Sequence, residues 1–175
     1  VDLRDDAGKI SVAPDKELVV TTDMVASGVH FLPDDPPDSV ARKALRVNLS
    51  DLAAKGAEPV GALLSLTLAG DDVWEDGFLT GVEAACESYG LPLLGGDTIA
   101  LPPDCPRVLG MTALGRAAAP VPSRAGGRSG DRLWLFGTLG DAAAGLALLI
   151  EDPKATGPLV DTYRRPVPQL AAGQV

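Results

Sequence analysis

Short apolar segments rich in β-branched residues alternate with longer segments of helical periodicity, and this alternation limits the possible folds more than any other feature of the chain. The segments with the character of strands are residues 18–22, 61–70, 91–98 and 107–115. Those with the character of helices are residues 40–55 and 72–89. Such alternation is typical of a sheet covered by helices. We therefore predict an α/β (or α+β) domain over residues 1–117.

The composition changes after this domain. Residues 118–130 are rich in Pro, Gly, Ser and Arg without hydrophobic periodicity, which indicates a linker. An apolar strand is expected at residues 133–137 ("LWLFG"), and a helix is expected after residues 138–141. We predict that residues 131–175 form the beginning of a second α/β domain.

Residues that favour helix N-termini explain part of the acidic sequence. Asp38 or Ser39 is expected to cap the helix at 40–55, and the stretch "DVWE" (72–75) reads as a capping box. The pair Asp71-Asp72 is explained by capping and by the helix dipole. The pair at residues 34–35 lies among prolines and is expected to be solvated surface.

The charge of the chain restricts its partners. The 175 residues carry a formal net charge of −9 and have a pI of about 4.5, so binding to nucleic acid or to an anionic membrane is not expected. No apolar segment reaches the ~18 residues that span a bilayer, the start lacks a basic and apolar leader, and Cys86 and Cys105 lack metal-ligand spacing. A reduced cytoplasmic protein is therefore expected. A phosphate-bearing substrate would need divalent cations to neutralise the charge between it and the chain.

Several aspartates are candidates for chemistry, and the residues alone leave alternatives open. Asp23 follows two threonines at the end of a strand, and these hard oxygen atoms suit Mg²⁺. Asp97 follows two glycines that would let the backbone approach an anion, although an ordinary turn is the alternative. Asp51 lies at the margin of an apolar helix and could instead form an i,i+4 ion pair with Lys55. Asp6 precedes the first strand, where a surface turn is nearly as plausible.

Five stretches taken together resemble the thiamine-monophosphate kinases, which belong to the superfamily of aminoimidazole-ribotide synthetase and selenophosphate synthetase. The stretches are "DDAG" (5–8), "TTDMVASGVHF" (21–31), "RKALRVNLSDLAAKGAEP" (42–59), "GGDT" (95–98) and "GDRLWLFGTLGDAAAGLALL" (130–149). The resemblance implies an α/β domain that forms a homodimer through its sheet. It also implies a kinase that uses ATP and several Mg²⁺ ions to convert thiamine monophosphate to thiamine diphosphate.

The resemblance also implies roles for individual residues. The implied magnesium ligands are Asp6, Thr21, Thr22, Asp23, Asp51 and Asp97. The implied nucleotide contacts are Gly96, Asp97 and Arg124, and His30, the single histidine of the chain, is the implied thiamine-phosphate contact. Asp51 and Arg124 are the implied catalytic residues. The attacking phosphate oxygen is already ionised, so catalysis would consist of positioning and charge neutralisation without a general base.

The chain also departs from the family pattern. Arg4 replaces the usual glycine, Gly8 replaces an alanine, and Gln169 stands where arginine is expected. The 175 residues are about half of a family member, so alone they are expected to be inactive or very weakly active. Two alternatives to the kinase remain: a truncated, non-catalytic paralogue that dimerises or binds nucleotide, and a sister enzyme of the same superfamily. Selenophosphate synthetase is disfavoured because that enzyme needs a catalytic cysteine or selenocysteine near its N-terminus, and no cysteine precedes Cys86 here.

Overall fold

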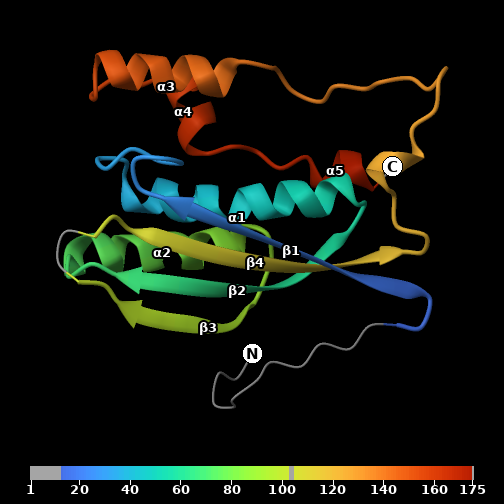
Figure 1. The fold of residues 1–175 in the computed structure, drawn as a ribbon, viewed down its shortest axis with the longest axis horizontal. Helices are drawn as coiled ribbons and strands as arrows, with labels where there is room; N and C mark the ends of the chain where they lie inside the picture. Colours follow the sequence, from blue (N-terminus) through green and yellow to red (C-terminus); the bar gives the residue numbers. More distant parts are fainter. Residues whose placement is uncertain (1–12, 103–104, 175) are drawn as a thin grey trace.

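A mixed four-stranded sheet forms the centre of the computed structural model, which describes residues 13–102 and 105–174 (Figure 1). Its strands are β1 (Lys16–Ala26), β2 (Glu58–Leu68), β3 (Leu93–Ala100) and β4 (Val108–Ala118). They are ordered β1-β4-β2-β3, with β4 antiparallel to both β1 and β2, and β3 parallel to β2. The predicted α/β class is confirmed, and β1 and β3 are the two edges of the sheet.

Two helices cover one face of the sheet, and the first of them starts earlier than predicted. Helix α1 (Pro37–Ala54) begins after Pro36 without a side-chain cap, so the predicted capping by Asp38 or Ser39 is wrong. A proline in the first turn suits this start, because its missing N–H would have no partner there. Helix α2 (Asp72–Ser88) starts at the predicted residue, and the predicted capping by the pair Asp71-Asp72 is confirmed for Asp71, whose side chain accepts a hydrogen bond from Trp74 N at 3.1 Å. The capping box, which made Asp72 the cap, is wrong by one residue.

The core lies between the sheet and these two helices. Leu45, Leu49 and Leu52 of α1 are fully buried against the sheet, as the apolar periodicity of this segment predicts. In the same core, the rings of Phe31, Trp74 and Phe78 stack in series, with centroid separations of 6.4 and 5.4 Å. Burial of these large side chains dominates the stability of the domain, at about 1.5–3 kcal/mol for each.

The other face of the sheet carries exposed apolar side chains. They belong to three strands, and they are Leu18, Val20, Met24, Leu63 and Ile99. Side chains of a strand alternate between the two faces, so residues 18, 20, 22 and 24 of β1 point away from the helices. An apolar sheet face of this kind is uncommon on a protein that acts as a monomer.

The chain after β4 lies on the side of α1 that faces away from the sheet (Figure 1). It forms the short helix η1 (Arg124–Gly126), then α3 (Asp141–Glu151), α4 (Pro158–Arg164) and α5 (Leu170–Gly173). Helices α3 and α4 pack closely because Gly145 has no side chain; a Cβ there would collide with the backbone of Leu159. Helix α5 lies against α1. No helix within residues 13–102 and 105–174 is long and apolar enough to cross a membrane.

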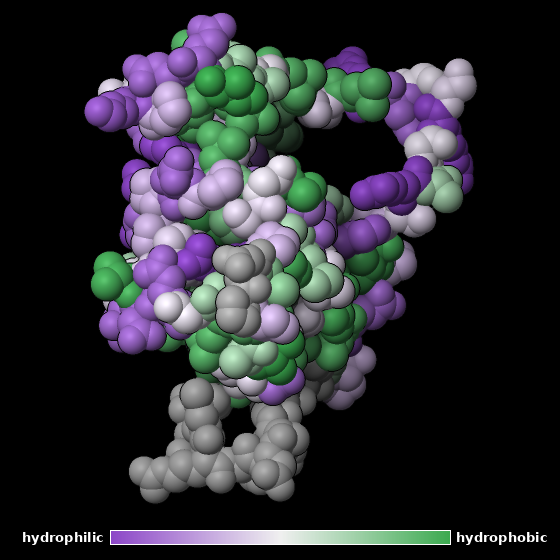
Figure 2. Space-filling view, turned by 60° about the vertical axis from the view of Figure 1, so that its left-hand side comes forward, coloured by the Kyte–Doolittle hydropathy of each residue, from purple (hydrophilic) through white to green (hydrophobic). Residues whose placement is uncertain are grey.

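The helix predicted after residues 138–141 is confirmed as α3, but the strand predicted at residues 133–137 is wrong. Leu133, Trp134, Leu135 and Phe136 are 100%, 77%, 62% and 58% exposed. A strand needs a neighbour for its backbone hydrogen bonds, and no described segment pairs with this one. Helix α3 also exposes apolar side chains, and Figure 2 shows hydrophobic residues at the surface of the upper part of the molecule, next to hydrophilic ones.

The glycines at 95 and 96 lie within β3 and do not form the turn that the sequence suggested. A Cβ atom at Gly96 would lie 1.8 Å from the carbonyl oxygen of Leu64 on the neighbouring strand. Backbone atoms of a central strand cannot move aside cheaply, so the pairing of β3 with β2 requires glycine at this position.

We predict that Gly96→Ala lowers the free energy of unfolding by roughly 1–3 kcal/mol or more, because the new methyl group separates β3 from β2. Urea denaturation followed by circular dichroism measures this change. Gly127→Ala is the matched control, since a Cβ there meets nothing within 4 Å and its φ of −64° suits alanine. Equal stability of the two variants would contradict the close strand contact.

Candidate functional site

The last turns of α1 lie beside β1, and this brings Asp51 to Thr21. The Thr21 hydroxyl donates a hydrogen bond of 2.7 Å to Asp51 Oδ2. Thr21 faces α1 because the side chains of β1 alternate, and its odd-numbered residues from 19 to 25 point to the helices. Asp51 is exposed at the margin of the helix, so this carboxylate avoids the cost of burial while it contacts the strand.

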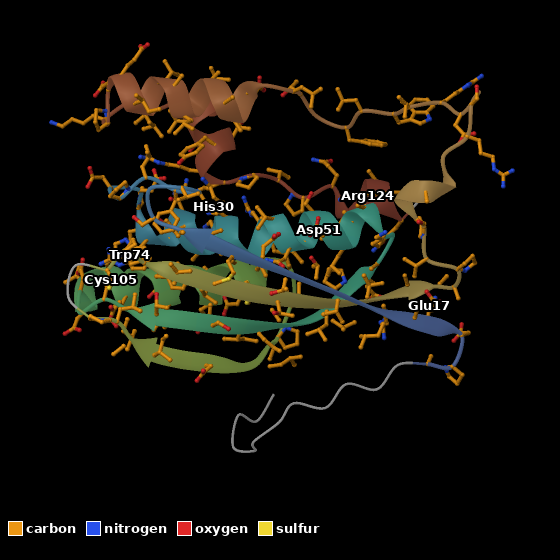
Figure 3. The ribbon with its side chains drawn as sticks, viewed as in Figure 1. Glu17, His30, Asp51, Trp74, Cys105 and Arg124 are labelled. Atoms are coloured by element: carbon orange, nitrogen blue, oxygen red, sulfur yellow. The ribbon has the colours of Figure 1, made fainter. Side chains whose placement is uncertain are left out.

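A cavity of about 460 Å³ opens at this contact. Its polar lining comes from β1, α1 and the segment after β4, and consists of Thr21, Asp51, Lys55, Ser123 and Arg124. Figure 3 shows Arg124 close to the end of α1 that carries Asp51. The cavity therefore combines hard oxygen donors with two cationic side chains, a set that suits a phosphate group and a divalent cation together.

Lys55 does not pair with Asp51. Its ammonium group donates a hydrogen bond of 2.9 Å to the carbonyl oxygen of Pro122, and among the ion pairs of the described residues none joins it to Asp51. The ion-pair explanation for Asp51 is therefore wrong. Lys55 instead ties α1 to the segment that carries Arg124. Ser123 starts helix η1 in this segment by accepting a hydrogen bond from Ala125 N at 3.2 Å.

Other predicted ligands lie on the opposite face of the sheet. The Thr22 hydroxyl accepts a hydrogen bond of 2.9 Å from Thr112, so it points away from α1. Asp97 pairs in register with Ser65, which is exposed on the same uncovered face. The register continues through Gly110 to Met24, so Asp97 lies about 14 Å, three strand spacings, from β1.

One chain therefore does not gather the predicted aspartates into one cage. The described residues contain no group of three or more His, Cys, Asp or Glu side chains that could hold a metal ion. The structure brings together Thr21, Asp51 and Arg124, and Asp23 lies two residues further along β1 on the same face as Thr21. Asp6 lies outside the described residues, and its predicted role stays a prediction, as do those of the residues on the opposite face.

His30 lies at the other end of α1, in the turn between β1 and α1 (Figure 3). Its Nδ1 accepts a hydrogen bond of 3.1 Å from Ala26 N. A ring nitrogen that accepts carries no proton, so the neutral imidazole has its proton on Nε2, from where it can donate to a ligand. Lys43, which contacts His30, precedes Asp51 by eight residues of α1, so these two residues are about 12 Å apart along the helix axis.

A buried group of charged and aromatic side chains supports the His30 turn. The Lys43 ammonium donates a hydrogen bond of 3.0 Å to the carbonyl oxygen of His30 and lies 3.6 Å from the centre of the Tyr163 ring. Beside it, Asp35 forms an ion pair of 2.7 Å with Arg164 and is only 2% exposed. The expectation that residues 34–35 are solvated surface is thus wrong for Asp35, whose charge is neutralised by α4.

Burial changes the protonation of two members of this group. It lowers the pKa of Lys43 to about 8, with Asp35 opposing and Arg164 reinforcing the effect. Burial also raises the pKa of Tyr163 to about 12, and the charge and hydrogen bonding of Asp35 add to the change. At neutral pH, Lys43 is therefore a charged group held in an unfavourable environment.

Sequence reasoning assigned no role at the Asp51 cavity or the His30 turn to three residues that shape them, which are Lys43, Lys55 and Tyr163. Lys55 was considered only as a partner for Asp51, because the spacing of four suggested it. Tyr163 lies 120 residues after Lys43, so no local pattern signals their contact.

The comparisons with known proteins agree with this architecture. Residues 4–117 match the family described as AIR synthase related protein, N-terminal domain, and the chain belongs to this family. Its similarity to thiamine-monophosphate kinases is specific, which confirms the family resemblance inferred from the motifs. The Thiamine-monophosphate kinase of Escherichia coli (strain K12) is 38% identical over 97% of this chain and 53% of its own length.

A second relative and a solved structure give the same picture. The Thiamine-monophosphate kinase of Caulobacter vibrioides is 41% identical over 97% of this chain and 49% of its own length. The structure described as "AaThiL complexed with AMPPCP and TMP" has a TM-score of 0.85 and 33% identity, over 94% of this chain and 54% of that one. The chain thus spans about half the length of the relatives that it matches.

The lowered pKa of Lys43 predicts a pH-dependent stability. Between about pH 8 and 10.5 the unfolded chain binds the lysine proton and the folded chain does not, so the free energy of unfolding rises with pH in this window. Relative to Lys43→Met, the wild type should gain about 2–3 kcal/mol from pH 7.5 to pH 10. Denaturation by urea at several pH values measures the difference, and a pH-independent difference would contradict the burial of a charged lysine.

Proposed function

We propose that the chain belongs to a Mg²⁺-dependent thiamine-monophosphate kinase, which transfers the terminal phosphoryl group of ATP to thiamine monophosphate and forms thiamine diphosphate. The observation that carries this proposal is the cavity in which Asp51 and Thr21 face Arg124. The relatives named thiamine-monophosphate kinase support this reaction. The similar structure complexed with AMPPCP, an ATP analogue, and TMP supports ATP and thiamine monophosphate as the two substrates. We infer a cytoplasmic location, where both substrates are available.

The donor atoms of the cavity fit a magnesium ion. Mg²⁺ is usually held by one or two carboxylates together with phosphate oxygens and water, and Asp51 and Thr21 supply such oxygens, with Asp23 on the same face. A bound Mg²⁺ would supply charge neutralisation for two anionic reactants. Several ions were expected, and this cavity accounts for those near Asp51 only.

The cationic side chains of the cavity would act on the transferred group. Arg124 can donate two parallel hydrogen bonds to phosphate oxygens, and its position in the lining of the same cavity as Asp51 suits the terminal phosphate of ATP. Lys55 holds the segment of Arg124 through Pro122, so it fixes this geometry. The nucleophile is an ionised phosphate oxygen, so the residues need only align the two phosphates and stabilise the charge.

The acceptor substrate would lie along α1. His30 is exposed near the start of this helix and its Nε2–H is available to a ligand, whereas Asp51 lies about 12 Å along the helix axis from Lys43, the residue that contacts His30. We propose that the thiamine rings lie on the His30 side and that the phosphate extends to the cavity. This arrangement separates recognition of the substrate from the chemistry at its phosphate.

We also propose a homodimer that forms through the uncovered face of the sheet. The exposed apolar side chains of β1, β2 and β3 support it, because their burial against a second copy would remove this surface from water. Light scattering of the purified chain should then give twice 17.9 kDa, and a monomer at micromolar concentration would contradict the proposal.

A non-catalytic module that binds nucleotide is the second candidate. The Asp51 cavity supports this candidate, because its carboxylate, hydroxyl and cationic side chains suit the phosphates of a nucleotide even without a second substrate. Binding of Mg·ATP without turnover by the longest available form of the protein would support this candidate, and turnover would exclude it.

We predict that Asp51→Asn lowers the turnover of thiamine monophosphate by roughly 10²-fold or more, because the cavity loses the charge that holds the metal and its phosphates. A coupled assay for ADP, with and without Mg²⁺, measures the effect on the longest active form. On the 175-residue chain, calorimetry with Mg·ATP measures the expected loss of affinity.

The matched control is Asp76→Asn, which makes the same chemical change at an exposed position of α2 remote from the cavity. It should leave turnover and affinity as they are in the wild type. Near-normal turnover of Asp51→Asn would refute the role given to this carboxylate.

A further inference from the structure

The His30 turn is held by backbone hydrogen bonds, one of which, from Ser27 N to Arg107 O at 2.9 Å, joins it to the segment before β4. His30 N donates to Ala26 O at 2.9 Å and Gly28 N donates to Phe31 O at 2.8 Å, which close the turn on itself. The contact from Lys43 to the carbonyl oxygen of His30, at 3.0 Å, is a tie between this turn and the body of the domain. It is made from α1, so it connects the imidazole to the helix that also carries Asp51.

Lys43 is itself fixed from the C-terminal part of the chain. The Tyr163 ring lies over its ammonium group at 3.6 Å, and Arg164 binds Asp35 at 2.7 Å on the next residue of α4. Asp35 in turn accepts a hydrogen bond of 2.9 Å from Leu32 N, in the loop that follows the His30 turn. Helix α4 therefore contacts both Lys43 and the loop that contains Asp35, although it lies about 120 residues later in the sequence.

A purely structural ion cluster is the simpler explanation, but it does not account for the choice of residue. Lys43 is 7% exposed, and a charged lysine at such a place costs free energy that a methionine of similar size would not. What a methionine could not provide is the hydrogen bond to His30. The retained charge thus points to a role at the His30 turn.

We propose that Lys43, closed in by Tyr163 of α4, is a positioning residue that fixes the His30 turn and so holds the imidazole with Nδ1 on the Ala26 amide and Nε2 free for a ligand. The identity of that ligand, the thiamine part of the substrate, rests on the proposed function. The coupling of α4 to the His30 turn does not rest on it. Docking of α4 thereby controls the geometry of the recognition end of the site.

The proposal also makes the turn sensitive to pH. The titratable and charged groups that face Lys43 are Asp35 from the loop and Tyr163 and Arg164 from α4. With the pKa of Lys43 at about 8 and that of Tyr163 at about 12, the lysine loses its proton first. A neutral amine is a weaker hydrogen-bond donor to the carbonyl oxygen of His30, and it makes no cation–π interaction with the Tyr163 ring. The turn should therefore be held less tightly above pH 8.

The single histidine of the chain makes a direct experiment possible. With ¹⁵N-labelled histidine, long-range ¹H–¹⁵N spectra show one imidazole and report which nitrogen carries the proton. At pH 7.5 the wild type should show the Nε2–H form as the dominant one. Lys43→Met and Tyr163→Leu should each shift the spectrum toward a mixture of the two neutral forms.

The matched control is Arg42→Met, which removes a cation from the adjacent position of α1, where the side chain faces Asp38 at 3.8 Å. Its imidazole spectrum should equal that of the wild type. Wild-type spectra between pH 7.5 and 10 should change with a midpoint near pH 8, and Lys43→Met should lack this change. Unchanged imidazole signals in both variants would overturn the proposal, and so would a wild-type spectrum that is constant over this range.

The wild-type titration decides the matter even where Lys43→Met does not fold. Binding of thiamine monophosphate, followed by calorimetry, is measured separately and should weaken at least 10-fold in Tyr163→Leu. Failure of the wild type to bind it would count against the proposed function, whereas the spectra would still test the positioning by Lys43.

Discussion

The placement of α1 between the sheet and the C-terminal helices determines where both parts of the candidate site lie. One end of this helix brings Asp51 against Thr21 of β1, and the other brings Lys43 against the carbonyl oxygen of His30. The helix holds this position because three leucines on one side are buried against the sheet. On its other side α4 and α5 pack against it. A small rotation of α1 would disturb the cavity and the His30 turn together.

Under the proposed function, the arrangement would let an acidic chain hold anionic substrates. A formal charge of −9 would repel phosphates, yet the cavity at Asp51 collects Lys55 and Arg124 from separate segments. One carboxylate with a hydroxyl beside it suits a divalent cation, and the two cationic side chains that also line the cavity suit the phosphate oxygens. The electrostatic conflict is thus resolved locally, within a few residues, and the rest of the surface remains acidic.

Local patterns were sufficient for most of the fold, because the strands and helices of residues 13–102 and 105–118 have the apolar content and periodicity that define them. They failed where a partner far along the chain decides the outcome. The segment at 133–137 is apolar enough for a strand and has no neighbour to pair with. Asp35 reads as surface until Arg164, 129 residues later, covers it.

The candidate site was predicted in part for the same reason. Thr21, Asp51 and Arg124, three of the predicted residues, line one cavity, because the end of α1 and the segment after β4 both lie near β1, and their roles stay predictions. The separation of Asp97 depends on the strand order β1-β4-β2-β3, which places β3 at the edge opposite β1 and which no local feature of "GGDT" reveals. The alternation of a strand predicts that Thr21 and Thr22 point in opposite directions, but only the position of α1 shows which of them faces the site.

A crystal structure of the protein with Mg²⁺ and a non-hydrolysable ATP analogue would test the central claim most directly. The account predicts a metal ion about 2.1 Å from a carboxylate oxygen of Asp51, with the terminal phosphate between that ion and the guanidinium group of Arg124. A triphosphate bound instead on the uncovered face of the sheet beside Asp97, with the Asp51 cavity empty, would contradict it.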